Sequence, residues 1–302
     1  KEIYQKLHQK IDTLNCRVHW NDTFYKILKE LYTGDEAELV AQMPSALTTL
    51  DELKVQFGKS EAQLRPTLDT LCRKGLVVDV FLNERYYYIP SPMVIGIFEF
   101  TMMRSGNDID IKKIAKLFHQ YMDDEGFYKL NFGKGQKMGL MRTLPYEESD
   151  FGDDYVEVLD YEKATEIVEN ASRYSIGTCS CRHEKLHAEK KNCDVPLDTC
   201  TSFGYSADYL IRNNLAREAS RSEMLENIAR SKELGLILNS DNIRNKNQFI
   251  CHCCKCCCNV LLGISKFGYP NTVVTSSYIA TVKADKCSGC GLCIDACAVD
   301  AI

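Results

Sequence analysis

Cysteine is distributed very unevenly along this chain. Only Cys16 and Cys72 lie in the first 178 residues, and the other fourteen of the sixteen cysteines fall between Cys179 and Cys297. A secreted protein held by disulfides is typically short and carries an export signal, whereas this chain has 302 residues and starts with the polar segment Lys1–Tyr4. The distribution therefore favours metal binding by thiolates in a reducing compartment, and we expect a cytoplasmic protein.

The remaining composition is that of a globular protein. The chain is 45% hydrophobic and 26% charged, with a formal net charge of −5. Its longest apolar runs, Met93–Phe98 and Val260–Ile264, are far shorter than the roughly 18 residues of a membrane-spanning helix. We therefore expect no membrane span, and the mild acidity argues against bulk binding to nucleic acid.

Residues 1–92 are predicted to form one module with the element order of a winged helix. The expected elements are helices at 1–14, 23–32 and 50–57, a turn at Gly58, a helix that Ser60 caps and Gly75 ends, and β-rich runs at 76–82 and 85–89. A small helical domain with a hairpin is the alternative. Residues 1–90 hold 12 Lys and Arg against 13 Asp and Glu, so a docking or structural role is favoured over DNA contact.

Residues 93–178 are predicted to be a helical linker region. An amphipathic pattern indicates a helix over 109–122, a second helix is expected over 160–171, and a short strand over 174–178. The glycines of 131–139 fit neither phosphate-binding template, so this segment is expected to be a loop.

Residues 283–302 carry the most specific motif. Four cysteines there have the spacing C-x2-C-x2-C-x3-C, with which bacterial ferredoxins bind a [4Fe-4S] cluster: Cys287, Cys290, Cys293 and Cys297. A single loop brings these thiolates to one cube only if the backbone turns back on itself, which Gly289 and Gly291 permit. In two-cluster ferredoxins the fourth cysteine serves the other cluster. We therefore expect a second motif beyond Ile302, with an upstream cysteine as the alternative source of the fourth ligand.

Residues 179–282 are predicted to be a helical cysteine-rich domain that binds clusters. Its first group of thiols is Cys179, Cys181, Cys193 and Cys200, and its second group is Cys251, Cys253, Cys254, Cys256, Cys257 and Cys258. Neighbouring side chains diverge in regular backbone, so six thiols in eight residues cannot all face one site. Subsets such as Cys254 with Cys257 converge if an irregular loop leads into a helix. The first group closes one cubane alone or shares a site with the second group.

Two alternatives to cluster binding are open for these thiols. A metallothionein-like zinc knot is one, although structural zinc normally takes two well-separated pairs of ligands. Cys193 and Cys200 as small core residues are the other.

Three residues are predicted to lie beside the thiols. Arg182 is expected to donate hydrogen bonds that offset cluster charge and raise the reduction potential. His183 and His252 are expected as hydrogen-bond donors or as occasional ligands of an iron. The segment His183–His187 also matches the zinc-peptidase pattern H-E-x-x-H, but it lies beside a thiolate pair and lacks a third ligand of the peptidase type. We therefore do not expect a zinc peptidase.

Taken together, these motifs resemble the ferredoxin-type 4Fe-4S dicluster iron-sulfur proteins of anaerobic bacteria. The resemblance rests on residues 92–104, 179–183, 251–258 and 287–302, and it extends over about two thirds of the chain. It implies [4Fe-4S] clusters, at least one in the C-terminal motif and one or more upstream. It also implies electron transfer beside a larger oxidoreductase as redox partner in anaerobic metabolism.

The expected fold is α+β and mainly α, with a winged-helix-like domain, a helical cysteine-rich domain and a ferredoxin-like segment. An electron-transfer protein or subunit is the first functional hypothesis, ahead of a stand-alone enzyme. The second is a redox-sensing or iron-sensing transcription regulator, and the third is an iron-sulfur enzyme with an open iron near His183 or His252. The oligomeric state is left open, and a homo-oligomer is compatible with the sequence.

Overall fold

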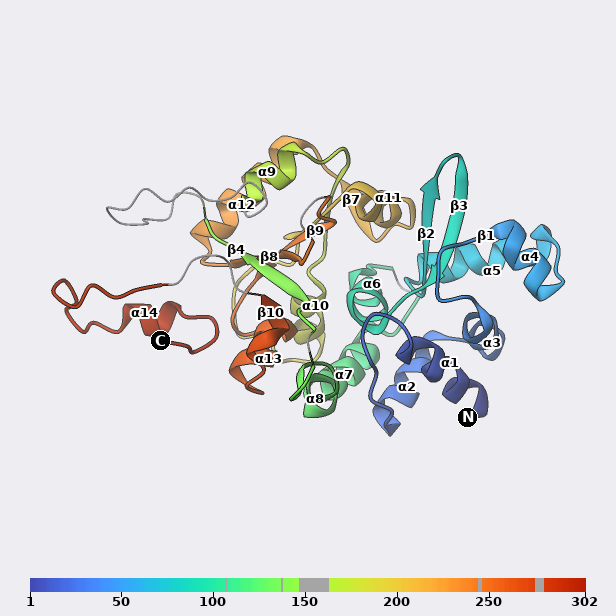
Figure 1. Ribbon diagram of the computed structural model, residues 1–302, viewed down its shortest axis with the longest axis horizontal. Helices are drawn as coiled ribbons and strands as arrows, with labels where there is room; N and C mark the ends of the chain where they lie inside the picture. Colours follow the sequence, from blue (N-terminus) through green and yellow to red (C-terminus); the bar gives the residue numbers. More distant parts are fainter. Residues whose placement is uncertain (107, 137, 147–162, 244–245, 275–279) are drawn as a thin grey trace.

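A computed structural model describes residues 1–106, 108–136, 138–146, 163–243, 246–274 and 280–302. Over these residues the chain is α+β and mainly helical, as predicted. Figure 1 shows the N-terminal helices and a tall hairpin at one end of the molecule, and the C-terminal segment with α14 at the other. None of the described helices combines the length and the apolar character that crossing a membrane requires.

The N-terminal part contains the helices and the hairpin that the sequence predicts, together with α3 and the short strand β1. Its elements are α1 (Glu2–Asp12), α2 (Asp22–Leu31), α3 (Gly34–Gln42), β1 (Thr48–Thr49), α4 (Leu50–Phe57), α5 (Glu61–Arg73), β2 (Val77–Leu82) and β3 (Arg85–Pro90). The three strands form an antiparallel sheet in the order β1-β3-β2. The hairpin turn is formed by Asn83 and Glu84, both with positive φ, as a tight two-residue turn requires.

Gly75 ends α5 as predicted, and its surroundings allow no side chain. Its φ is +78°, and an added Cβ would lie 2.3 Å from the Cβ of Phe100. We expect Gly75→Ala to lower the free energy of unfolding by about 3 kcal/mol, since left-handed backbone costs about 1 kcal/mol and overpacking adds about 2 kcal/mol. Gly58 is the matched control, because its φ is +60° but no atom lies within 4 Å of the added Cβ.

Urea unfolding followed by circular dichroism measures both glycine variants. Gly58→Ala is expected to lose only the conformational part, about 1 kcal/mol. Equal losses in the two variants would show that the contact with Phe100 does not matter.

The rest of the described chain contains further helices and a second sheet, and buried residues of its segment 93–132 share one apolar core with the N-terminal helices. Its helices are α6 (Phe98–Met103), α7 (Ile111–Met122), α8 (Glu125–Phe132), α9 (Ala164–Glu169), α10 (Ser180–His187), α11 (Gly204–Arg212), α12 (Arg221–Glu233), α13 (Asn259–Ser265) and α14 (Leu292–Ala296). Its strands are β4 (Met141–Leu144), β5 (Tyr174–Gly177), β6 (Cys200–Phe203), β7 (Ala216–Glu218), β8 (Ile237–Asp241), β9 (Phe249–Cys253) and β10 (Val273–Val274). An irregular turn, Met93–Ile97, and a short 3₁₀ turn, Pro270–Thr272, complete it.

These strands form one seven-stranded sheet in the order β10-β4-β8-β9-β6-β5-β7. Only β10 and β4 are parallel. The predicted boundary at 178/179 passes between β5 and its sheet partner β6. The expectation of a helical region over 179–282 is therefore incomplete: α10 to α13 lie there, but so do five strands. These strands were missed because they are only two to five residues long, and Cys251–Cys253 was interpreted as part of a metal motif.

The two faces of the sheet are different. On one face, α9 and α12 bury Val168 and Met224 against Leu238 and Ile250. On the other face, alternation along β9 places Cys251 and Cys253 toward α6, α10 and α13. The cysteines of the sheet therefore face away from its main apolar core.

Helix α11 joins the sheet to the N-terminal part. Arg212 Nε donates to the buried Asp79 at 2.8 Å, and Asn213 Nδ2 donates to the same carboxylate at 2.8 Å. The hydroxyl of Tyr209 donates to the Cys72 and Val77 carbonyls. Because Asp79, Asn213 and Tyr209 are buried and these polar groups are satisfied, the strand β2 has a defined position against α11.

Candidate metal centre

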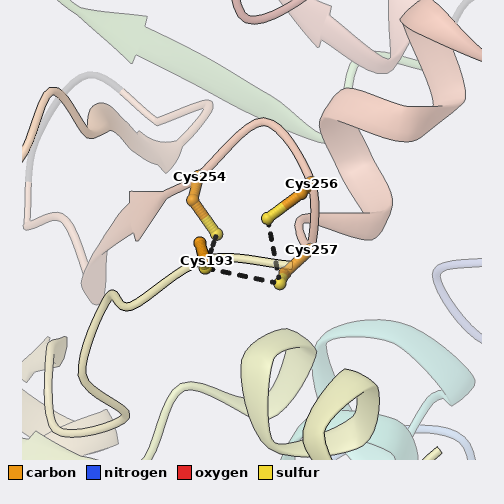
Figure 2. A group of neighbouring side chains, drawn as sticks. All are labelled: Cys193, Cys254, Cys256 and Cys257. Carbon is orange, nitrogen blue, oxygen red and sulfur yellow. Dashed lines mark hydrogen bonds between the residues drawn. The ribbon is translucent and has the colours of Figure 1, made fainter. Parts of the chain in front are cut away.

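Four thiols converge at the end of β9, and we call them the thiol tetrad: Cys193, Cys254, Cys256 and Cys257. Their sulfur atoms all lie within 4.8 Å of one another. Figure 2 shows three of them on the loop that follows β9 and Cys193 on a separate loop that crosses it. Among the described residues, this is the only set of three or more His, Cys, Asp or Glu side chains that meets so closely.

The tetrad forms because the chain turns sharply where β9 ends. The backbone N–H of Cys258 donates to the Cys254 carbonyl at 3.2 Å, so residues 254–258 form one tight turn before α13 begins. This is the irregular loop entering a helix that the sequence predicted, and the convergence of Cys254 with Cys257 is confirmed. Cys193 comes from the segment between α10 and β6, so the first predicted group of thiols does not stay together.

The distances in the tetrad suit a thiophilic metal. Cys193 Sγ lies 3.9 Å from Cys254 Sγ and 4.0 Å from Cys257 Sγ, and the Cys256 and Cys257 sulfurs are 3.4 Å apart. Four thiolates around one tetrahedral ion with bonds of about 2.3 Å have sulfurs about 3.8 Å apart. A cubane binds its four thiolates on four different irons, so it requires the same sulfurs to spread. The donor set fits iron or zinc, and the spacing fits a single ion without rearrangement.

The buried guanidinium of Arg182 supplies positive charge beside the tetrad. Its Nη1 donates to the His252 carbonyl at 2.8 Å and to Cys254 Sγ at 3.8 Å, and its Nη2 donates to the Thr199 hydroxyl. The hydrogen bond from Cys257, followed by the charge of Arg182, lowers the pKa of Cys254 to about 5. Arg182 thus lies where the sequence predicted, next to the thiols whose negative charge it offsets.

One cavity on the same side of the sheet is lined by eight thiols, of which two, Cys254 and Cys257, belong to the tetrad. We call the other six the cavity thiols: Cys179, Cys181, Cys200, Cys251, Cys253 and Cys258. The sulfurs of Cys258 and Cys253 are 3.3 Å apart. Hydrogen bonds with Cys251 and Cys258 lower the pKa of Cys253 to about 6. All ten cysteines predicted between 179 and 258 therefore belong to one of two neighbouring groups.

The predicted histidines, His183 and His252, interact with groups other than the thiols. Ring nitrogens of the buried His252 lie 2.7 Å from Ser231 Oγ and 3.1 Å from Thr201 Oγ1, on the sheet face opposite the cysteines. Burial, and then the charge of Arg182, lowers the pKa of His252 to about 3, so the ring is neutral. His183 Nδ1 lies 2.6 Å from the Met102 carbonyl. The two imidazoles bind protein groups rather than thiols, and their predicted role beside a cluster stays a prediction.

The H-E-x-x-H segment does place two imidazoles on one face of α10. Nε2 of His183 lies 2.9 Å from Nε2 of His187, a hydrogen-bond distance. Glu184, however, is fully buried and pairs with His119 at 3.0 Å and with Lys185 at 2.7 Å. Its carboxylate is thus committed to His119 and Lys185, as expected for a structural residue.

The C-terminal cysteines lie on the surface, with Cys287, Cys290 and Cys293 exposed. Gly289 and Gly291 have φ of +70° and +78°, so the backbone makes the turns that the motif requires. In the described residues, no three of these thiols lie within 4.8 Å of one another.

This segment touches the turn that carries the tetrad. Lys255 Nζ lies 2.6 Å from Asp300 Oδ1, and Ala298 and Val299 pack on the buried cluster that includes Cys253 and Cys258. The ion pair is partly exposed, so the apolar contact carries the larger share of the attachment.

No family model, no curated protein and no solved structure matches this chain. The resemblance inferred from the cysteine motifs therefore stays a prediction, and function has to be inferred from the thiols and their surroundings.

Sequence patterns did not single out two residues that matter at this site. Asn239 lies on β8 opposite Cys251, and Lys255 pairs with Asp300 of the C-terminal segment. Lys255 could have been noticed as the one cation within the run of cysteines. Asn239 offered no such signal, because its position depends on the pairing of β8 with β9.

Proposed function

We propose that this chain is an iron-sulfur electron-transfer protein, or the electron-transfer subunit of an oxidoreductase. The observation that carries the proposal is the turn at 254–258: it bears three thiols of the tetrad, it adjoins the cavity thiols, and its Lys255 contacts the C-terminal segment with the ferredoxin spacing. One-electron transfer between clusters requires closely spaced centres and no protein base or nucleophile. A chain of thiol groups meets that requirement.

The residues of this chain would bind the metal and adjust its reduction potential. Thiolates of the tetrad and of the motif Cys287–Cys297 would hold the metal, and Arg182 would stabilise the more negative, reduced state. An iron-sulfur cluster, when bound, supplies the reversible one-electron chemistry. The apolar contact of Ala298 and Val299, together with the ion pair between Lys255 and Asp300, would set the distance between the terminal and upstream centres.

The test is the metal and sulfide content of anaerobically purified full-length protein, with iron, zinc and acid-labile sulfide measured per chain. We expect iron with comparable sulfide, a visible absorption that bleaches reversibly with dithionite, and electron paramagnetic resonance signals in the reduced state. Zinc without sulfide, or iron that is not reduced reversibly, would overturn the proposal.

The ion pair at the C-terminal segment tests the relay itself. We expect Lys255→Glu to slow electron transfer between the upstream and terminal centres, because reversal of the charge repels Asp300. The double variant Lys255→Glu with Asp300→Lys restores the opposite charges and is expected to recover the rate. Stopped-flow reduction measures both variants, and an unchanged rate in Lys255→Glu would exclude this contact from the relay.

A cluster-sensing transcription regulator is the second candidate, because the N-terminal part has the element order helix, strand, helix, helix, hairpin. Two cations of its candidate recognition region are already paired, Arg65 with Glu61 at 2.8 Å and Lys74 with Glu36 at 2.7 Å. This leaves less positive charge for phosphates, so the relay is favoured. DNA binding that changes with cluster state would reverse the order of the two candidates.

A further inference from the structure

Five of the six cavity thiols, all but Cys179, form a connected string that leaves out the tetrad. Cys200 interacts with Cys251, Cys251 with Cys253, Cys253 with Cys258 at 3.3 Å, and Cys258 with Cys181. The string draws on β6, β9, the residue before α13 and α10. Five thiols from four separate segments thus meet at one place.

The sulfur contacts of these thiols are distinct from those of the tetrad, although Cys254 and Cys257 border the same cavity. Cys251 and Cys253 point to the cavity side, and the pairing of Thr201 with Ile250 places Cys200 next to Cys251 on that side. Cys254 follows directly but already belongs to the turn, where its sulfur approaches Cys193. Neighbouring cysteines in the sequence are therefore directed to different groups.

A buried amide donor lies beside the string. Asn239 is fully buried and pairs across the sheet with Cys251, so its side chain is on the face of the cavity. Its Oδ1 accepts from the Thr143 hydroxyl at 2.9 Å, whereas its Nδ2 makes no hydrogen bond of normal geometry in the described part of the chain and interacts with the Cys253 thiol. A buried amide without a full hydrogen bond costs about 1–3 kcal/mol, so a better acceptor is expected at this position.

The cavity has space for several atoms beside this amide. Its volume is about 80 Å³. Apolar side chains such as Val94, Phe100 and Leu210 line it beside the thiols. The site thus combines thiolate ligands, a buried amide donor and an apolar wall. This combination suits an inorganic cluster, whose sulfides accept hydrogen bonds and whose reduction potential depends on the exclusion of water.

We propose that the cavity thiols bind an iron-sulfur cluster of their own, separate from the metal of the thiol tetrad, and that Asn239 donates a hydrogen bond to it. The inference rests on the proposed function, because it takes iron and sulfide as the metal chemistry of this chain. It divides the ten upstream cysteines into two centres. In each of the adjacent pairs Cys253–Cys254 and Cys257–Cys258, one thiol belongs to the cavity centre and the other to the tetrad.

The test removes thiols that are distant in sequence from the tetrad turn. In the full-length protein, Cys181→Ser with Cys200→Ser is expected to lose one cluster's iron and sulfide while the metal of the tetrad and of the C-terminal motif remains. Cys72→Ala is the control, since Cys72 is buried in α5 outside both groups. Circular dichroism checks that both variants are folded.

The metal and sulfide contents of these variants decide between one upstream centre and two. Unchanged iron and sulfide in the double variant would overturn it while the proposed function stands. Loss of the tetrad metal at the same time, in a folded protein, would show one shared centre and would also overturn it. Wild-type protein that contains no iron and sulfide would refute the proposed function, and with it this inference.

A second variant examines the hydrogen bond without removing a ligand. Asn239→Ala is expected to retain the full iron and sulfide content and to lower the reduction potential of one upstream centre, because a donor to the reduced cluster is lost. The C-terminal centre is expected to keep its potential. Unchanged potentials at every centre would exclude Asn239 as a donor.

Discussion

Replacing Cys254 and Cys257 together by serine is expected to remove all metal from the thiol tetrad. Both sulfurs lie within about 4 Å of Cys193, so the double variant keeps only two of the four thiols. Serine hydroxyls stay protonated at neutral pH and are poor ligands for soft metals, which prefer thiolate sulfur. Metal and acid-labile sulfide per chain, measured on anaerobically purified protein, should fall by the whole content of this centre.

The same experiment has an internal comparison. The centre in the cavity and the C-terminal motif should retain their iron, because Cys254 and Cys257 are not among the thiols assigned to them, although both border the cavity. Cys72→Ala should match the wild-type protein in every metal. A double variant with full metal and sulfide content would contradict the assignment of the tetrad as a metal centre.

Replacing Arg182 by methionine is expected to be the most destabilising single change near the thiols. The guanidinium is fully buried and donates to the His252 carbonyl, to Thr199 and to Cys254, and its charge offsets that of the thiolates. Removing one partner of a buried charged group costs about 3–5 kcal/mol, because the other partners stay buried without compensation. We expect a loss of about 3 kcal/mol in urea unfolding under anaerobic conditions and a lower reduction potential.

Arg182→Lys separates the charge from the geometry. Lysine keeps the positive charge but lacks the planar fork that reaches the carbonyl, the hydroxyl and the thiol at once. Its stability and potential should therefore lie between those of the wild type and Arg182→Met. If Arg182→Met is as stable as the wild type and shows the same potentials, the guanidinium does not balance the charge of a cluster.

Local patterns in the sequence predicted much of the secondary structure. Caps and turn residues near their elements, such as Ser60, Gly75 and the Asn83–Glu84 turn, are found at the expected positions. The helix 109–122 is confirmed as Ile111–Met122, and the strand at 174–178 as Tyr174–Gly177. The loop expected at 131–139 begins two residues later, because α8 extends to Phe132. The helix expected at 160–171 is shorter in the described residues, Ala164–Glu169, while 160–162 fall outside them.

The seven-stranded sheet could not be predicted in the same way. Its strands are short and its neighbours are distant in the chain, for example β4 beside β8 and β6 beside β9. Such pairing is stabilised by burial of both faces under helices. A local pattern of two to five residues therefore does not predict which strands pair.

The sequence by itself determined that thiols dominate the chemistry of this protein. It located fourteen cysteines after residue 178, marked the ferredoxin spacing at Cys287–Cys297 and predicted that the run 251–258 could not serve one site. Only the tertiary structure decided which thiols belong together. Cys193 joins Cys254 because two loops meet, and Cys251 joins Cys200 because β9 pairs with β6. The physical reason is that side chains alternate between the faces of a strand, so the assignment of adjacent cysteines depends on where each strand ends.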